Sequence, residues 1–103
     1  MAETEVVIGG NVMRKVIKGK LYDTERATLI HEYQKYANVN SPYGHTKTWV
    51  NAKLYKTQKG NWFEFVEGKN TSDVLNKLDE DNVKEILSND PEKYEKFFEL
   101  EDA

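Results

Sequence analysis

The chain has 103 residues and a net charge of −3; 38% of its residues are hydrophobic, 12% aromatic and 32% charged, and it contains no cysteine. This balance is too apolar for a disordered chain and too polar for a membrane protein, while the lack of cysteine excludes disulfides, thiolate metal sites and cysteine nucleophiles. We therefore expect a soluble single domain in a reducing compartment, by default the cytoplasm, and no membrane partner.

The charge is unevenly distributed along the chain. Residues 13–60 carry ten basic and three acidic side chains, a net charge of +7, whereas residues 61–103 carry five basic and thirteen acidic ones, a net charge of −8. A basic half beside an acidic half is compatible with a positive face that binds a phosphate backbone. The alternative is that the two halves intermix in space and the charges only keep the surface hydrated.

In chain order, residues 1–12 are expected to form an N-terminal arm and residues 13–103 a single α+β domain. The run 16–22 indicates two short strands around a turn at Lys18 and Gly19. Asp23 and Thr24 then offer helix N-caps, and apolar residues recur at three- and four-residue spacing as far as Ala37, which predicts a helix with Arg26 on its solvent side.

The second half of the chain carries the strongest local pattern. Residues 46–57 and 62–67 alternate apolar and polar side chains around a turn that contains Gly60, which predicts a β-hairpin. Residues 74–78 fit either a helical turn or a short strand. Asp79 then caps a predicted helix that buries Val83, Ile86 and Leu87, and a last helix begins at Pro91.

No set of residues forms a recognisable catalytic or metal site. His31 and His45 lack the spacing of a zinc motif, the serines lie outside a nucleophile elbow, and Gly9 and Gly10 lack the lysine and helix of a phosphate loop. We therefore expect a binding protein rather than an enzyme, without a cofactor or a metal.

The predicted hairpin of residues 53–62 is the best candidate for a binding element. Lysines there can contact phosphates, and amide side chains can donate to base edges in the minor groove. The alternative is that the tip is polar only because it is exposed. We expect Trp49, Tyr55 and Trp62 to lie in the core. The candidate DNA-binding residues are Lys53, Lys56, Gln58, Lys59, Gly60 and Asn61, with a second basic patch at Arg14, Lys15, Lys18 and Lys20.

Three segments carry a resemblance to a known family: KVIKGKLYDTERA at 15–27, LYKTQKGNWF at 54–63 and PEKYEKFF at 91–98. They resemble small proteins of Gram-positive plasmids and integrative elements, and in size and hairpin the chain is similar to the TcpK-like winged-helix proteins of conjugation. The resemblance implies an α+β, winged-helix-like single domain with a small antiparallel sheet, a projecting hairpin wing and about three helices.

The same resemblance implies a function. The chain would be an accessory protein of a conjugative plasmid or mobile element that binds double-stranded DNA at the origin of transfer, with its wing in the minor groove. Its partners would be DNA, the relaxase or other relaxosome proteins, and further copies of itself on DNA. The alternative is a protein-binding inhibitor or adaptor, similar to anti-CRISPR proteins, that uses its acidic helices.

Overall fold

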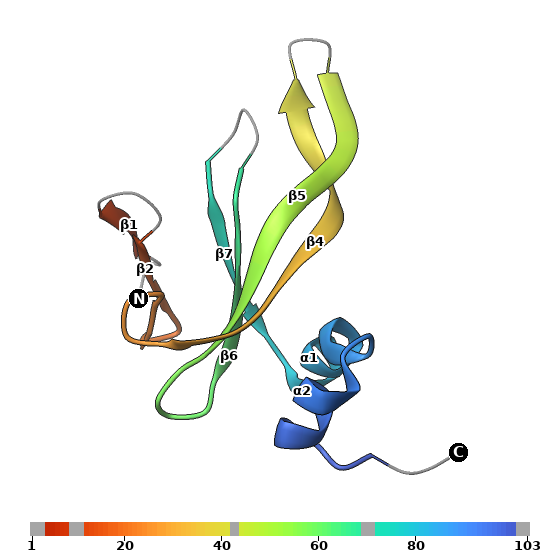
Figure 1. Ribbon diagram of the computed structural model, residues 1–103. Helices are drawn as coiled ribbons and strands as arrows, with labels where there is room; N and C mark the ends of the chain where they lie inside the picture. The colour runs from red at the N-terminus through yellow and green to blue at the C-terminus, as the bar shows by residue number, and fades with distance from the viewer. Residues whose placement is uncertain (1–3, 9–11, 42–43, 69–71, 101–103) are drawn as a thin grey trace.

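The computed structural model describes residues 4–8, 12–41, 44–68 and 72–100 (Figure 1). They form two antiparallel sheets in which the strands follow chain order, β1-β2-β3 and β4-β5-β6-β7, and two helices after the last strand. The bounds are β1 Thr4–Ile8, β2 Val12–Ile17, β3 Lys20–Asp23, β4 Thr28–Ser41, β5 Gly44–Lys56, β6 Trp62–Val66, β7 Val74–Leu78, α1 Glu80–Leu87 and α2 Pro91–Phe97.

The predicted winged-helix-like fold with about three helices is wrong, because the chain is mostly β and its described residues form two helices. The helix predicted from Thr24 to Ala37 is instead a turn followed by β4. The Asp23 carboxylate accepts a hydrogen bond from the Glu25 backbone at 2.9 Å, and the Asp23 carbonyl accepts one from Ala27 at 3.0 Å. These bonds close one turn and leave the following residues extended.

Thr24 explains why the helix does not start. Its backbone N–H donates to the Met13 carbonyl at 3.0 Å, and its hydroxyl oxygen accepts from the Met13 N–H at 2.9 Å. The hydroxyl oxygen that would cap a helix is therefore paired with β2 instead. Residues Thr4–Ile8, within the expected N-terminal arm, form β1 on the other side of β2.

Other local predictions are confirmed. The hairpin predicted at 46–57 and 62–67 is β5 and β6, and the small hairpin predicted at 16–22 is β2 and β3. Residues 74–78, which fitted either a helical turn or a short strand, form strand β7. Asp79 caps α1 through reciprocal bonds with Asn82 of 2.8 and 3.1 Å, and Pro91 begins α2.

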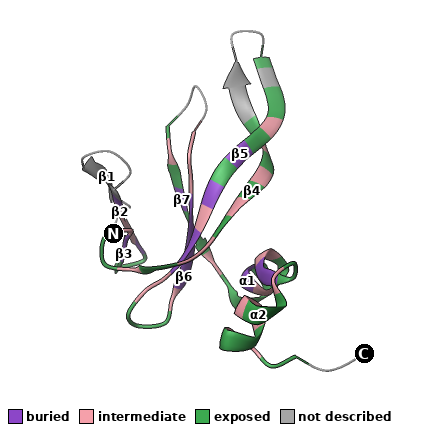
Figure 2. Ribbon diagram, in the orientation of Figure 1, coloured by how far each residue is buried: buried purple, intermediate pink, exposed green. Residues whose placement is uncertain are grey.

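Strand β6 lies between two cores, and its residues 62–65 are all buried (Figure 2). Phe63 and Phe65 face the small sheet, where they pack with Met13 and Tyr22. On the other face, Trp62 packs with a cluster under the two helices that contains Leu54, Val83 and Leu87. One sheet thus separates the β1–β3 layer from the helical layer.

The ribbon that projects is β4–β5 and not the hairpin of residues 53–62. Figure 1 shows β4 and β5 extending past the ends of β6 and β7, whereas the β5–β6 turn lies at the opposite end of the sheet. The side chains of the projecting part are mostly exposed, as Figure 2 shows for the part of the ribbon that is described. The expected wing is therefore a turn that lies beside the small sheet.

Candidate nucleic-acid interface

Three turns border a partly open hollow of about 570 Å³. They are the β2–β3 turn, the turn at residues 24–27 and the β5–β6 turn at residues 57–61. The polar side chains that line the hollow come from all three turns: Lys20, Asp23, Arg26, Thr57, Gln58, Lys59 and Asn61.

The β5–β6 turn is held in shape by its own backbone. The Thr57 N–H donates to the Asn61 carbonyl at 2.8 Å, the Gly60 N–H donates to the Thr57 carbonyl at 2.9 Å, and the Thr57 hydroxyl oxygen accepts from the Asn61 N–H at 3.0 Å. Gly60 has a φ of +86°, a conformation that side-chain-bearing residues rarely adopt. The turn therefore presents the exposed side chains of Gln58 and Lys59 from a fixed backbone.

The hollow carries an excess of positive charge. Asp23 is 5% exposed, and its Oδ2 atom lies 3.2 Å from Nε of Arg14 and 3.7 Å from Nε of Arg26. Since this carboxylate is already paired, Lys20 and Lys59 remain exposed beside it without a described ion pair. Such a group of cations and amides is suited to a phosphate or another anion.

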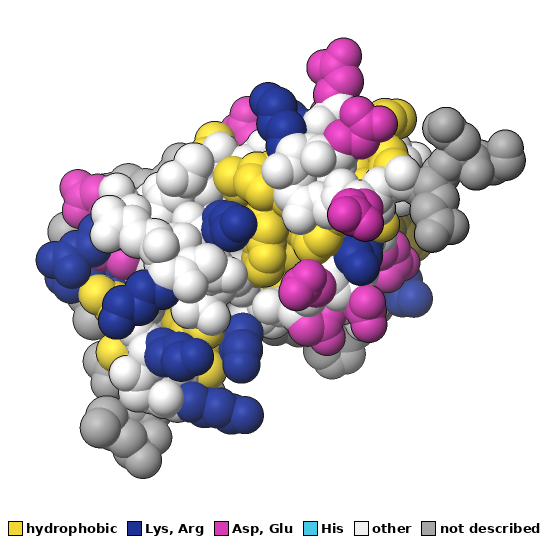
Figure 3. Space-filling view, turned by 90° about the horizontal axis from the view of Figure 1, so that it is seen from below, with side chains coloured by type: hydrophobic (Ala, Val, Ile, Leu, Met, Phe, Trp, Pro, Cys, Tyr) yellow, Lys and Arg dark blue, Asp and Glu magenta, His cyan; other side chains and the backbone are white. Residues whose placement is uncertain are grey.

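The wider surface shows the same bias. In the view from below (Figure 3), Lys and Arg side chains gather at one end, and Asp and Glu side chains lie mainly at the other. The acidic end corresponds to the helices, whose exposed carboxylates include Glu80, Asp81, Glu85, Glu92 and Glu95. The charge separation along the sequence is thus also a separation in space.

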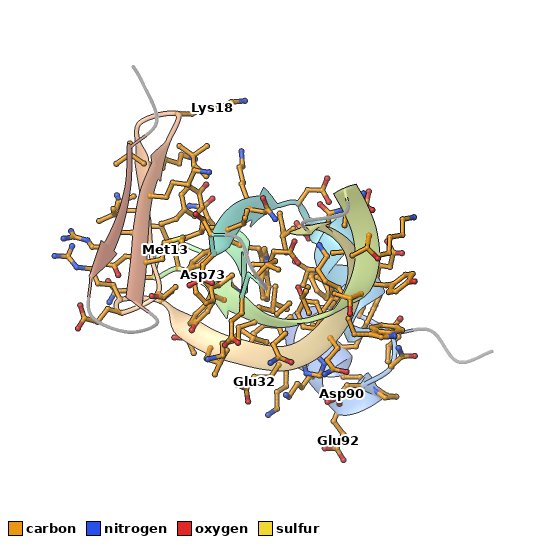
Figure 4. The ribbon with its side chains drawn as sticks, turned by 90° about the horizontal axis from the view of Figure 1, so that it is seen from above. Met13, Lys18, Glu32, Asp73, Asp90 and Glu92 are labelled. Carbon is orange, nitrogen blue, oxygen red and sulfur yellow. The ribbon has the colours of Figure 1, made fainter. Side chains whose placement is uncertain are left out.

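The structure brings some candidate DNA-binding residues together and separates others. Lys20, Gln58, Lys59 and Asn61, which belonged to two predicted patches, line the same hollow. Lys18, at the tip of the β2–β3 turn, points away from the protein (Figure 4).

The remaining candidates are engaged elsewhere. Arg14 pairs with Asp23, and Lys15 donates to the Leu75 carbonyl at 3.4 Å. Lys53 and Lys56 lie on opposite faces of β5, where Lys53 is 4.0 Å from Glu32 and Lys56 lies over the Trp62 ring at 5.0 Å. These four residues therefore do not line the hollow.

Arg26 is a lining residue that the sequence did not indicate. The helical interpretation placed it on an exposed helix face, but the turn at residues 24–27 directs it to the hollow. The Asp23 carboxylate accepts from the Glu25 N–H two residues later, and the tendency of Asp to form such a turn is the sequence signal that favours a turn over a helix here.

A second polar cluster lies on the helical face of the large sheet, around the buried carboxylate of Glu64, which is 4% exposed. It accepts hydrogen bonds from the Tyr33 hydroxyl at 2.5 Å, from Nζ of Lys35 at 2.8 Å and from the Asn76 side-chain amide at 3.1 Å. Burial acts to raise the pKa of Glu64, but the bonds from Lys35, Tyr33 and Asn76 outweigh it and lower the pKa below its ordinary value.

Burial and the hydrogen bond to the Glu64 carboxylate both raise the pKa of Tyr33, so its hydroxyl stays protonated and acts as a donor. Every member of the Glu64 cluster has a hydrogen-bond partner. The arrangement is that of a structural network, and the sequence did not indicate it.

Comparison with known proteins gives no assignment: no family, curated protein or solved structure matches the chain. Among the residues that the structure describes, no three histidine, cysteine or acidic side chains group as metal ligands. No helix in the described ranges is long and apolar enough to cross a membrane.

Proposed function

We propose that this protein binds DNA through the basic hollow formed by its three turns. The observation that carries the proposal is the convergence of Lys20, Arg26 and Lys59 with the amides of Gln58 and Asn61 around one opening. Cations with amide donors are the groups that proteins use to contact a sugar-phosphate backbone. The turns make this contact from beside the small sheet, and no helix or wing enters a groove as in a winged-helix protein.

The resemblance to conjugation proteins points to double-stranded DNA from the origin of transfer of the encoding element, and to the relaxase as a protein partner. The three cations of the hollow can contact the sugar-phosphate backbone, but sequence preference would require Gln58 or Asn61 to reach base edges. A comparison of origin DNA with a scrambled duplex of equal length distinguishes backbone contact from sequence preference.

The test is a titration of fluorescent duplex DNA with wild type and with the double variant Lys20→Ala/Lys59→Ala, at several salt concentrations. Each lost phosphate contact should reduce the slope of log affinity against log salt by about 0.9, so the double variant should lose about 1.8. The control is Lys96→Ala, which removes an exposed lysine from α2 and should bind as wild type does.

Two results would contradict the proposal. One is a wild type that fails to bind either duplex at low salt. The other is a double variant whose affinity and salt slope equal those of wild type and of the Lys96→Ala control.

The acidic helices favour a second function, the binding of a basic protein surface. Five exposed carboxylates on α1 and α2 lie at the end of the molecule opposite the hollow (Figure 3). Under this alternative, Glu92→Gln/Glu95→Gln would weaken capture of a relaxase or another basic partner, whereas Lys20→Ala/Lys59→Ala would not.

A further inference from the structure

An exposed aromatic pair lies on the projecting β4–β5 hairpin, on the face of the large sheet that the small sheet covers further along. Tyr36 and Trp49 are directly opposite each other in the strand register, with ring centroids 5.4 Å apart. Tyr36 is 57% exposed and Trp49 is 56% exposed, more than any other large hydrophobic residue that the structure describes. Large rings usually lose most of their surface to the core, so two adjacent rings left in solvent require an explanation.

The pair belongs to a strip of four cross-strand pairs on one face of the hairpin, which we call the aromatic strip. The register places Glu32, Gln34, Tyr36 and Asn38 opposite Lys53, Asn51, Trp49 and Lys47. All eight side chains are at least partly exposed. In Figure 4, Glu32 projects from the convex side of the curved β4 ribbon.

The chemistry of the aromatic strip is that of a surface for unpaired bases. Two ring systems offer stacking, and the amides of Gln34 and Asn51, joined by a hydrogen bond of 3.3 Å, offer donors and acceptors beside the rings. The charge of Glu32 is offset by Lys53 at 4.0 Å, so Lys47 leaves the strip with a net positive charge. Aromatic rings beside basic residues are how proteins bind single-stranded nucleic acids.

The strip also adjoins the basic small sheet. In the register, the pair Glu32 and Lys53 continues through Phe65 to Leu75 on the same face. Lys15 of β2 reaches this row through its hydrogen bond to the Leu75 carbonyl. A strand of nucleic acid that runs along the strip from the rings to Lys53 would therefore approach Lys15 of the small sheet.

We propose that the aromatic strip binds unpaired nucleobases by stacking them on Tyr36 and Trp49, so that the protein recognises single-stranded segments of the DNA. The inference rests on the proposed function, because it assigns a contact with unpaired bases to a protein whose hollow is proposed to bind the duplex part of the same DNA. A role confined to hairpin stability is the alternative, since cross-strand aromatic pairs stabilise antiparallel strands without any ligand. That role requires ring-to-ring contact but no binding of bases.

The experiment compares three labelled probes of equal length: oligo-deoxythymidine, an abasic oligonucleotide that has the sugar-phosphate backbone without bases, and a duplex. Wild type should bind the thymidine probe at least about fivefold more tightly than the abasic one. Tyr36→Ala/Trp49→Ala should lower affinity for the thymidine probe by about 5- to 150-fold for each stacked base, and change abasic binding less than twofold. Circular dichroism checks that this variant is folded.

Trp49 also provides a direct signal, because the other tryptophan, Trp62, is 7% exposed. Saturation with the thymidine probe should quench the tryptophan emission of wild type but not of Trp49→Phe. The conservative variant Tyr36→Phe/Trp49→Phe keeps an aromatic ring at each position and should retain most of the affinity, which separates stacking from a general loss of hairpin structure.

The inference is overturned if Tyr36→Ala/Trp49→Ala binds the thymidine probe as wild type does, if it loses thymidine and abasic binding equally, or if Trp49 emission is unchanged at saturation. Failure of the proposed function has a different pattern. In that case Lys20→Ala/Lys59→Ala would leave duplex and abasic binding unchanged, whatever the aromatic variants do.

Discussion

Substituting glutamine for Glu64 tests how much the buried carboxylate and its three donors stabilise the large sheet. Glutamine keeps the shape of the side chain, so its oxygen can still accept one bond and its amide can donate to the Tyr33 hydroxyl oxygen. The ion pair with Lys35 at 2.8 Å is lost. A hydrogen bond to a charged group contributes about 1.5–3 kcal/mol, and the Lys35 side chain, 38% exposed, can turn to water. We therefore expect a loss of about 2 kcal/mol.

Urea unfolding followed by circular dichroism measures this loss. With a typical slope of about 1–3 kcal/mol per molar urea, the midpoint should fall by about 1 M. The control is Glu32→Gln, which removes a carboxylate that is 68% exposed and 4.0 Å from Lys53. The control should lie within about 0.5 kcal/mol of wild type.

The pH dependence gives an independent check. The folded-state pKa of Glu64 lies below its ordinary value, so its stabilisation is fully present above the unfolded value of about 4.3 and is lost as the pH falls through the folded value. The difference in stability between wild type and Glu64→Gln should therefore shrink in acid. A difference that is absent at pH 7, or that stays constant as the pH falls, would refute the reasoning.

Two further substitutions test the turn and the helical layer. Gly60→Ala should lower the free energy of unfolding by about 1 kcal/mol. The loss comes from backbone strain alone, because φ is +86° and an added Cβ would meet nothing within 4 Å. An unchanged thermal unfolding curve would show that the turn relaxes. Leu87→Ala removes a fully buried side chain of α1 and should cost about 2–5 kcal/mol in urea, and a cost below about 1 kcal/mol would mean that α1 is not firmly packed on Trp62 and Leu54.

The sequence was informative wherever local chemistry and burial agreed. Asp79 and Pro91 marked the starts of both helices, and the alternation of the buried Val50 and Ala52 with the exposed Trp49 and Asn51 marked β5. In these places one face is buried and the other faces solvent, so apolar residues recur with the period of the helix or strand.

Strand β4 was missed because its inward face is not apolar. That face includes Lys35, which reaches over β5 to Glu64, while the outward face carries the exposed Tyr36. A change of register between Leu29 and His31 further breaks the alternation. The remaining apolar residues happened to fit a spacing of three and four, and a lysine in a polar network is indistinguishable in sequence from a lysine in solvent.

The candidate hollow was partly predictable. The lysines and amides of the β5–β6 turn stood out as donors at a hairpin tip, but their neighbours depend on how the small sheet docks. Lys20 and Lys59 are 39 positions apart in the chain, and nothing local relates them. The exposure of Trp49 was likewise hidden, because a tryptophan on an alternating strand is usually buried.

The order of the strands has a consequence for folding. In both sheets every strand pairs with its neighbour in the chain, so most backbone pairing closes short loops and the entropic cost of each step is small. Docking of the two sheets is different, since it brings Lys15 to Leu75 across 60 positions. We expect the β4–β7 meander to form early and the β1–β3 layer to join it late, so that substitutions at Met13 accelerate unfolding more than they slow folding.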